Sequence, residues 1–218
     1  MSKIDLTKYK TLVFDCDGVI LNSNKIKTQA FYKVAKIYGQ KPAQMLRDYH
    51  VKNGGVSRYE KFKYLLRKIL NKPIIDEEYN RLLFNFSKEI KSGLMSCEVT
   101  KDLHMLRDKT KNSKWLIISG GDQKELREIF SLRNLDHLFD GGIFGSPKNK
   151  ITILKNEIAN KNIIGKSLFF GDSINDFEAA KSIKMDFIFL SEWTEVKNWL
   201  SFTSQKRIKF YKNIRSLI

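Results

Sequence analysis

Two pairs of aspartates, each placed directly after a short apolar run, are the residues best suited to chemistry in this chain. Asp15 and Asp17 follow the run LVF in LVFDCDGVI, and Asp172 and Asp176 follow LFF in LFFGDSIND. An apolar run bounded by turn residues is typical of a buried strand in an α/β sheet. Ligands in such sheets bind beyond the carboxyl ends of the strands, so we expect both pairs at one crevice.

The crowding of carboxylates predicts a bound cation at this crevice. Like charges at close range are costly unless a positive charge compensates them. Mg²⁺ is such a cation, because it binds through a few carboxylates together with water and a substrate phosphate. A lone aspartate at a strand end could instead be a helix cap or a turn former. That alternative has to explain two acidic strand ends at once.

The elements that must position these residues alternate between strand and helix. Between about residues 21 and 94, however, apolar side chains recur at helical spacing and no strand pattern is present. Elsewhere, strand–helix alternation implies a parallel sheet with helices on both faces, which is an α/β fold. The pattern predicts strands at 10–15, 115–119, 167–172 and 187–190, and helices at 122–132, 150–160 and 174–184.

Four motifs occur in an order that is known from one large family. DCDGV at Asp15 matches the family pattern DxDG[TV], and GDSIND at Asp172 matches GDSxxD. Ser119 ends the apolar run WLIISGG, and a lysine lies near a helix start in GSPKNKITIL. On these motifs the chain resembles the haloacid dehalogenase-like (HAD) superfamily, and within it the phosphoglycolate phosphatase and β-phosphoglucomutase-like group.

The resemblance implies a role for each of the four aspartates. Asp15 would be the nucleophile that forms an aspartyl-phosphate, and Asp17 the general acid and then the general base. The Asp15 carboxylate, the Asp17 main-chain carbonyl and Asp172 would hold Mg²⁺. Asp176 would complete the metal site by orienting a metal-bound water, or it would orient the lysine.

Further residues are implied to bind the phosphoryl group and the substrate. Ser119 would donate a hydrogen bond to a transferring phosphoryl oxygen, and Gly120 would lie beside the substrate. In many relatives a proline follows the lysine directly, but here Ser146 precedes the proline, and Lys148 and Lys150 both follow it. We favour Lys150 as the catalytic lysine, because the first turn of a helix fixes its position better. Lys148 is then a substrate-binding candidate, and the alternative is that both lysines are solvated.

The helical segment 21–94 resembles the helical cap of this family, inserted after the first strand of a Rossmann-like catalytic core formed by 1–20 and 95–218. Such a cap covers the crevice and selects the substrate. In its loop NGGVSRY, Ser57 is a natural N-cap. Arg58 follows at the helix start, where the macrodipole disfavours a cation. We therefore expect Arg58 to bind an anion such as a substrate carboxylate or phosphate, unless it is an ordinary surface arginine.

Composition limits the partners and the location. The chain has 218 residues, a net charge of +16 and lysines spread over nearly every segment. This spread favours a compositional bias over a nucleic-acid-binding face, because specific binders cluster their charge. Cys16 and Cys97 have no metal or redox spacing, which fits a reducing compartment. No apolar run has the length of a signal or a membrane span, so we expect a cytoplasmic protein. We expect a monomer or a homodimer.

The function predicted from these features is Mg²⁺-dependent hydrolysis of a small phosphorylated metabolite, a phosphosugar or a phosphoglycolate-like acid, through an aspartyl-phosphate. A phosphomutase on the same scaffold is the first alternative. A basic nucleic-acid-binding protein with a vestigial site is the second, and the four intact aspartates speak against it. Dehalogenase chemistry is disfavoured, because cleavage of a carbon–halogen bond has no use for Asp17 or for a metal.

Overall fold

A parallel β-sheet lies at the centre of the computed structural model, which describes residues 4–218. Within this range the sheet has six strands in the order β3-β2-β1-β4-β5-β6, and every neighbouring pair is parallel. The predicted α/β fold is therefore confirmed, although β3 and β6 were not predicted. The strands are β1 (Thr11–Phe14), β2 (Lys114–Asp122), β3 (Ile143–Ser146), β4 (Ser167–Gly171), β5 (Asp186–Leu190) and β6 (Lys209–Tyr211).

Alternating side chains of the central strands fill two separate apolar cores. Phe14 of β1 and Trp115 of β2 belong to one core, where their rings lie 4.6 Å apart. Val13 and Leu116, their neighbours in sequence, belong to the other core. Successive side chains of a strand point to opposite faces of the sheet, so strands covered on both faces are apolar along their whole length. This explains the uninterrupted apolar runs that precede the aspartates.

Helices cover both faces of the sheet. Those of one face, α7 (Lys150–Ala159) and α8 (Ile174–Ser182), contribute apolar side chains to the core that contains Val13. On the opposite face, α5 (Leu103–Lys109) and α6 (Gln123–Leu132) contribute to the core that contains Phe14. A further helix, α9 (Trp199–Gln205), precedes β6. None of the helices in the described range is both long and apolar enough to cross a membrane.

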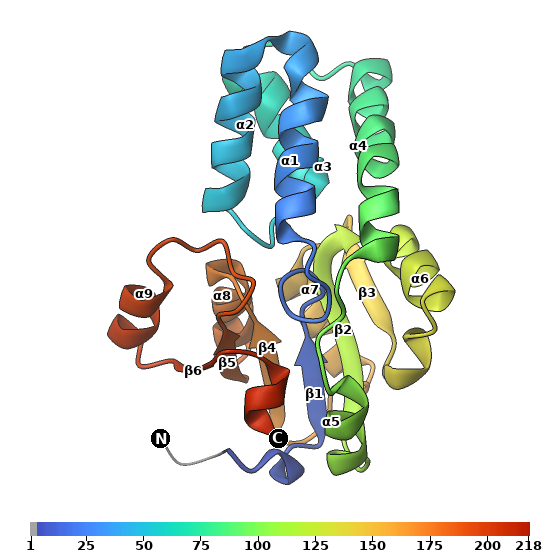
Figure 1. The fold of residues 1–218 in the computed structure, drawn as a ribbon, viewed down its shortest axis with the longest axis vertical. Coiled ribbons are helices and arrows are strands. Elements are labelled where there is room, and N and C mark those ends of the chain that lie inside the picture. The colour runs from blue at the N-terminus through green and yellow to red at the C-terminus, as the bar shows by residue number, and fades with distance from the viewer. Residues whose placement is uncertain (1–3) are drawn as a thin grey trace.

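Four helices form a separate group beyond the carboxyl end of β1 (Figure 1). Within this helical group, the rings of Phe31, Phe62 and Phe86 pack against one another with centroids 4.3–5.7 Å apart. These aromatic contacts join three of the four helices. The group corresponds to the predicted cap, although the division into two domains stays a prediction. Its helices are α1 (Asn24–Ala35), α2 (Gln40–Lys52), α3 (Arg58–Tyr64) and α4 (Asp76–Ser96).

Short helical segments link the longer elements. A π-helical segment, Leu65–Ile69, continues α3. The 3₁₀ segments are Leu6–Lys8, Lys36–Tyr38, Asp136–Leu138 and Ile214–Leu217.

Candidate active site

Asp15 directly follows β1, and protein groups contact one of its two carboxylate oxygens. The Cys16 amide donates to Oδ1 at 2.8 Å, and the Lys150 amine lies 2.9 Å from the same oxygen. In the described part of the chain, no donor contacts Oδ2. The residue is only 3% exposed, so water is largely excluded around it. A carboxylate fixed through one oxygen can present the other to an electrophile.

The end of β4 supplies the second acidic group. Ser173 caps α8, and its hydroxyl donates to Oδ2 of Asp176 at 2.6 Å, while Oδ1 of Asp176 accepts from Lys150. Both oxygens of Asp176 are thus engaged by protein donors. Asp172 accepts a hydrogen bond from Asn24 at 2.7 Å through Oδ2. Asp176 is therefore well placed to hold Lys150, as one of its two predicted roles requires.

Glycine is required where the loop after β1 passes Asp172. Gly18 has a φ of +77°, and a Cβ atom there would lie 2.1 Å from Oδ2 of Asp172. Glycine alone avoids both the left-handed strain and this clash. The glycine of the DCDGV motif therefore lets two loops from separate strands approach each other.

Three buried carboxylates could hold a metal ion. One oxygen from each of Asp15, Asp172 and Asp176 lies within 4.8 Å of the others. Burial and, to a smaller extent, the charge of Asp176 raise the pKa of Asp15 to about 7, although the positive charge of Lys150 lowers it. Burial and the charges of Asp176 and Asp15 raise the pKa of Asp172 well above its ordinary value. A divalent cation would relieve this repulsion, so the residues present fit one.

The two candidate lysines lie in different surroundings. Lys150, in the first turn of α7, is 3% exposed and contacts both Asp15 and Asp176. Burial lowers its pKa, but the two carboxylates outweigh burial and raise the pKa above its usual range. Lys148 is exposed and lines a different pocket, next to Arg127. The geometry brings Lys150, and not Lys148, to the aspartates.

Asp17 is held by side chains at the start of α1 and does not belong to the cluster of Asp15, Asp172 and Asp176. Lys27 of α1 donates to Oδ2 at 2.6 Å, and the Ser23 hydroxyl donates to Oδ1 at 2.5 Å. Burial raises the pKa of Asp17, but Lys27 and Ser23 outweigh burial and hold the pKa below its usual value. The side chain of Asp17 is thus a carboxylate in this arrangement, and it lies outside the group of three metal-binding candidates. Its predicted metal ligand, the main-chain carbonyl, stays a prediction.

The last residues of β2 lie beside the pocket that contains Asp15. Ser119 is fully buried, and its hydroxyl accepts a hydrogen bond from the Gly121 amide at 3.0 Å. Gly120 and Gly121 line the same pocket as Asp15. A Cβ atom on Gly120 would lie 2.1 Å from the main-chain oxygen of Gly55, which belongs to the loop between α2 and α3. The backbone of the helical group therefore touches the backbone of the core beside the aspartates.

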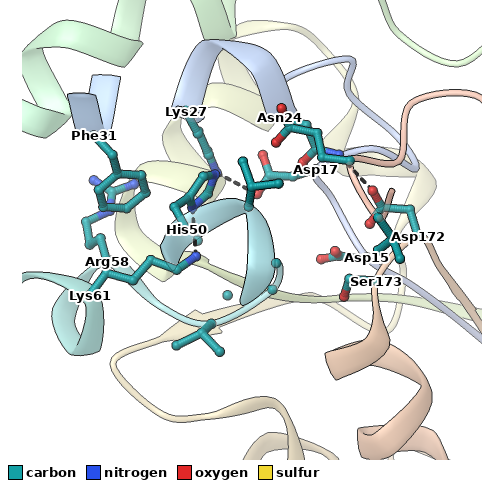
Figure 2. Close-up of a pocket in the computed structure, with 18 of the residues that line it drawn as sticks. Asp15, Asp17, Asn24, Lys27, Phe31, His50, Arg58, Lys61, Asp172 and Ser173 are labelled. Atoms are coloured by element: carbon teal, nitrogen blue, oxygen red, sulfur yellow. Dashed lines mark hydrogen bonds and ion pairs between the residues drawn. The ribbon is translucent and has the colours of Figure 1, made fainter. Parts of the chain in front are cut away.

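Side chains from all four helices of the helical group line one side of the pocket. Phe31 comes from α1, His50 from α2, Arg58 and Lys61 from α3, and Phe86 from α4. Figure 2 draws Lys61, His50 and Arg58 on one side of the pocket, and Asp15 and Asp172 on the other. The arrangement leaves an acidic side formed by the core and a largely basic and aromatic side formed by the helices.

Arg58 does bind an anion, and that anion belongs to the protein. Its guanidinium donates to both oxygens of Glu125 in α6, with NH1 to Oε2 at 3.0 Å, and also to Ser87 at 2.8 Å. Its carbon Cζ lies 4.6 Å from the centroid of the Phe86 ring. The expected N-cap is also present, because the Ser57 hydroxyl accepts from the Glu60 amide. Arg58 still lines the pocket, so its substrate contact stays a prediction.

Sequence reasoning did not identify several of the residues that line this pocket. Asn24, Lys27 and Phe31 lie three or four positions apart on α1, which places them on one helix face. That spacing, directly after the first motif, was the available signal. His50 and Lys61 lie on different helices, and their pairing depends on how α2 packs on α3.

The fold and the site define an α/β protein whose buried carboxylates lie at the carboxyl ends of the central strands of a parallel sheet. A model of the haloacid dehalogenase-like hydrolase family matches residues 12–190. The chain belongs to this family.

Individual relatives agree with that assignment. A phosphorylated carbohydrates phosphatase from Thermotoga maritima is 26% identical over 188 residues, covering 83% of this chain and 84% of that protein. A hydrolase from Pseudomonas syringae has a TM-score of 0.70 at 20% identity, with 95% of each chain covered. A β-phosphoglucomutase from Clostridium difficile has a TM-score of 0.70 at 17% identity, covering 96% of this chain and 93% of the other. The predicted family and the predicted enzyme class, a phosphoric monoester hydrolase, are confirmed by these comparisons.

Proposed function

We propose that this enzyme hydrolyses small phosphate monoesters through a phosphoryl group transferred to Asp15. The observation that carries the proposal is the state of the Asp15 carboxylate, which is held through Oδ1 and has no donor on Oδ2 among residues 4–218. Attack by Oδ2 on phosphorus would form an aspartyl-phosphate and release the alcohol. Water would then hydrolyse this intermediate. Splitting the displacement in two lowers the barrier of each step.

Lys150 would stabilise the negative charge of the reacting groups. Its amine lies 2.9 Å from Oδ1 of Asp15, and an ion pair with Asp176 fixes its orientation. Phosphoryl transfer depends mostly on positioning and on charge stabilisation, which a fixed cation in a dry site supplies efficiently. Gly120 and Gly121 line the same pocket as Asp15 and Lys27.

Asp17 would transfer the protons. As a general acid it has to give a proton to the leaving oxygen, and as a general base it has to take one from water. Lys27 and Ser23 hold it as a carboxylate here, which is the form that accepts a proton. Donation requires a protonated Asp17, so the contact with Lys27 has to loosen when substrate binds.

Asp15 and Asp172 would hold Mg²⁺, with the main-chain carbonyl of Asp17 as the further ligand predicted from sequence. When bound, this ion would neutralise the carboxylates and the phosphate oxygens. Asp176, whose oxygens both accept from protein donors, would act mainly through Lys150.

A phosphosugar or a phosphoglycolate-like acid is the substrate class that we propose. The name of the Thermotoga maritima relative, a phosphorylated carbohydrates phosphatase, supports the first of these. The pocket is small and lies between the core and the helical group, which suits a compact metabolite.

The test is phosphate release from a panel of phosphorylated metabolites in ¹⁸O-labelled water with Mg²⁺. Hydrolysis puts solvent oxygen into the released phosphate, whereas a phosphomutase moves the phosphoryl group within the substrate and releases none. Beryllofluoride, a mimic of the aspartyl-phosphate, should bind only when Mg²⁺ is present. The proposal fails if no ester in the panel releases phosphate and beryllofluoride does not bind.

A further inference from the structure

Lys61 is the one cationic side chain among the described residues of this pocket that has no carboxylate partner. Lys27 pairs with Asp17, and Arg58 pairs with Glu125. Within the described part of the chain, Lys61 has a single hydrogen-bond partner, Nδ1 of His50, at 2.8 Å. The charges of Asp17 and Glu195 favour its charged form, but neither carboxylate is within ion-pair distance, and burial and the neighbouring lysines outweigh them.

The surroundings of Lys61 make an uncompensated charge costly. The residue is 1% exposed, and its amine lies 5.4 Å from the centroid of the Phe31 ring. Burial and the nearby charge of Lys27 lower its pKa to about 7. Burial and Lys61 itself hold the pKa of His50 well below its ordinary value, so His50 is neutral and accepts from the amine. A buried ammonium group of this kind gains strongly from an anion placed beside it.

The position of the amine selects the part of a substrate that it could contact. Lys61 and His50 come from the helical group and lie across the pocket from Asp15 and Asp172 (Figure 2). A phosphoryl group on Asp15 would lie at the acidic side of the pocket. The alcohol portion of the ester would extend toward the helices, so Lys61 faces the leaving group.

We infer that Lys61 binds a carboxylate on the leaving alcohol, and that the enzyme acts on phosphorylated hydroxy acids. This inference rests on the proposed function. One unpaired positive charge matches one negative charge, and a dianionic group would leave a second charge buried without a partner. His50 positions the amine and makes no contact of its own with substrate in this scheme.

The experiment compares two esters of nearly equal size, phosphoglycolate and ethyl phosphate, which differ by the carboxylate. Wild-type enzyme should show kcat/KM at least about tenfold higher for phosphoglycolate, as expected for one hydrogen bond to a charged group. Lys61→Met, which keeps the length and removes the charge, should lose at least about tenfold more on phosphoglycolate than on ethyl phosphate. Lys63→Met is the matched control, because Lys63 lies on the same helix, is exposed and pairs with Glu60. It should keep the wild-type ratio.

Binding gives a readout that does not depend on turnover. In an Asp15→Asn background, calorimetry should show tighter binding of phosphoglycolate than of ethyl phosphate, and Lys61→Met should remove the difference. Thermal melts establish that each variant folds. If Lys61→Met does not fold, Lys61→Gln, which also removes the charge but keeps a polar end group, takes its place in both comparisons.

The two proposals fail in different ways. Hydrolysis of both esters without preference, or equal losses in Lys61→Met, overturns the role of Lys61 and leaves the phosphatase intact. Absence of phosphate release from any ester overturns the proposed function. The calorimetric comparison of the two esters then decides whether Lys61 binds a carboxylate.

Discussion

Arg58 and Glu125 form a two-bond ion pair that joins α3 of the helical group to α6 of the core. Their side chains are 4% and 15% exposed, so the pair is shielded from water. Tyr59, the next residue along α3, donates to Asp122 at 2.6 Å and adds a second link between the same parts. These contacts hold the helices against the sheet on one side of the pocket.

Removing one member of this pair should destabilise the protein. Arg58→Met leaves the Glu125 carboxylate buried without its partner, and loss of one partner from a buried pair typically costs about 3–5 kcal/mol. Urea unfolding of the wild type, Arg58→Met, Glu125→Met and the double variant measures the free energy of unfolding. The double variant should recover part of the loss. A cost below about 1 kcal/mol for Arg58→Met would place the pair among weak surface contacts.

Replacing the nucleophile should stop turnover without unfolding the protein. An asparagine in place of Asp15 keeps the shape of the side chain, but its amide cannot attack phosphorus. We expect Asp15→Asn to lower kcat by at least about 10³-fold, as for other nucleophile knockouts. Steady-state phosphate release is the measurement, with circular dichroism as the folding control. A variant that kept a tenth of the activity would remove Asp15 from this role.

The two lysines after Pro147 should differ sharply in their effect. Lys150 contacts Asp15 and Asp176, whereas Lys148 is exposed in another pocket. Lys150→Met should lower kcat by about 10²–10³-fold, the usual cost of removing a preorganised charge. Lys148→Met should lower it far less. Kinetics on the same ester compare the variants, and similar losses for both would contradict the assignment of Lys150.

Lys61 should make the stability of the unliganded protein depend on pH in a specific direction. Its pKa is about 7 in the folded protein and ordinarily 10.5, so the unfolded chain binds more protons between these values. The free energy of unfolding therefore rises with pH across this window. Methionine does not titrate. Lys61→Met should thus be more stable than wild type at pH 7, by no more than about 5 kcal/mol, and the gain should shrink toward pH 10.5.

Urea unfolding of both proteins across this range is the measurement. Lys63→Met, altered at an exposed residue of the same helix, should show no such dependence relative to wild type. A difference between Lys61→Met and wild type that stays constant with pH would show that Lys61 does not titrate in this window.

A divalent cation should be needed for activity and should stabilise the fold. Chelation should abolish phosphate release, and added Mg²⁺ should restore it. Three buried carboxylates repel one another, so Mg²⁺ bound between them should stabilise the folded protein. A ligand that binds only the folded state raises the melting temperature, and we expect this rise on addition of Mg²⁺. Asp172→Asn should reduce this rise. An equal rise in the variant would mean that Mg²⁺ stabilises the protein at another site.

Local patterns were sufficient to predict the acidic side of the site. An apolar run that ends in aspartate identifies a buried strand and its carboxyl end, and a parallel sheet then brings Asp15 and Asp172 together. Lys150 followed from its place in the first turn of a predicted helix. The strands β3 and β6 were missed because they are short, with four and three residues, and are interrupted by glycine or flanked by lysine. Their strand character comes from pairing with β2 and β5.

The helical side of the site could not be predicted in the same way. His50 and Lys61 are 11 residues apart on different helices, and Arg58 and Glu125 are 67 apart. Their contacts depend on how helices pack, which no single segment encodes. The expectation that Arg58 binds an anion was reasonable from its place at a helix start. The sequence did not indicate that the anion would be a glutamate of the protein.

The contact between Gly120 and Gly55 determines the spacing between the helical group and the core beside the aspartates. Two main chains meet there with no space for even a methyl group. A larger residue at position 120 would push the loop that contains Gly55 away from the core. Glycine at position 120 therefore sets how closely the loop of the helical group approaches the aspartates.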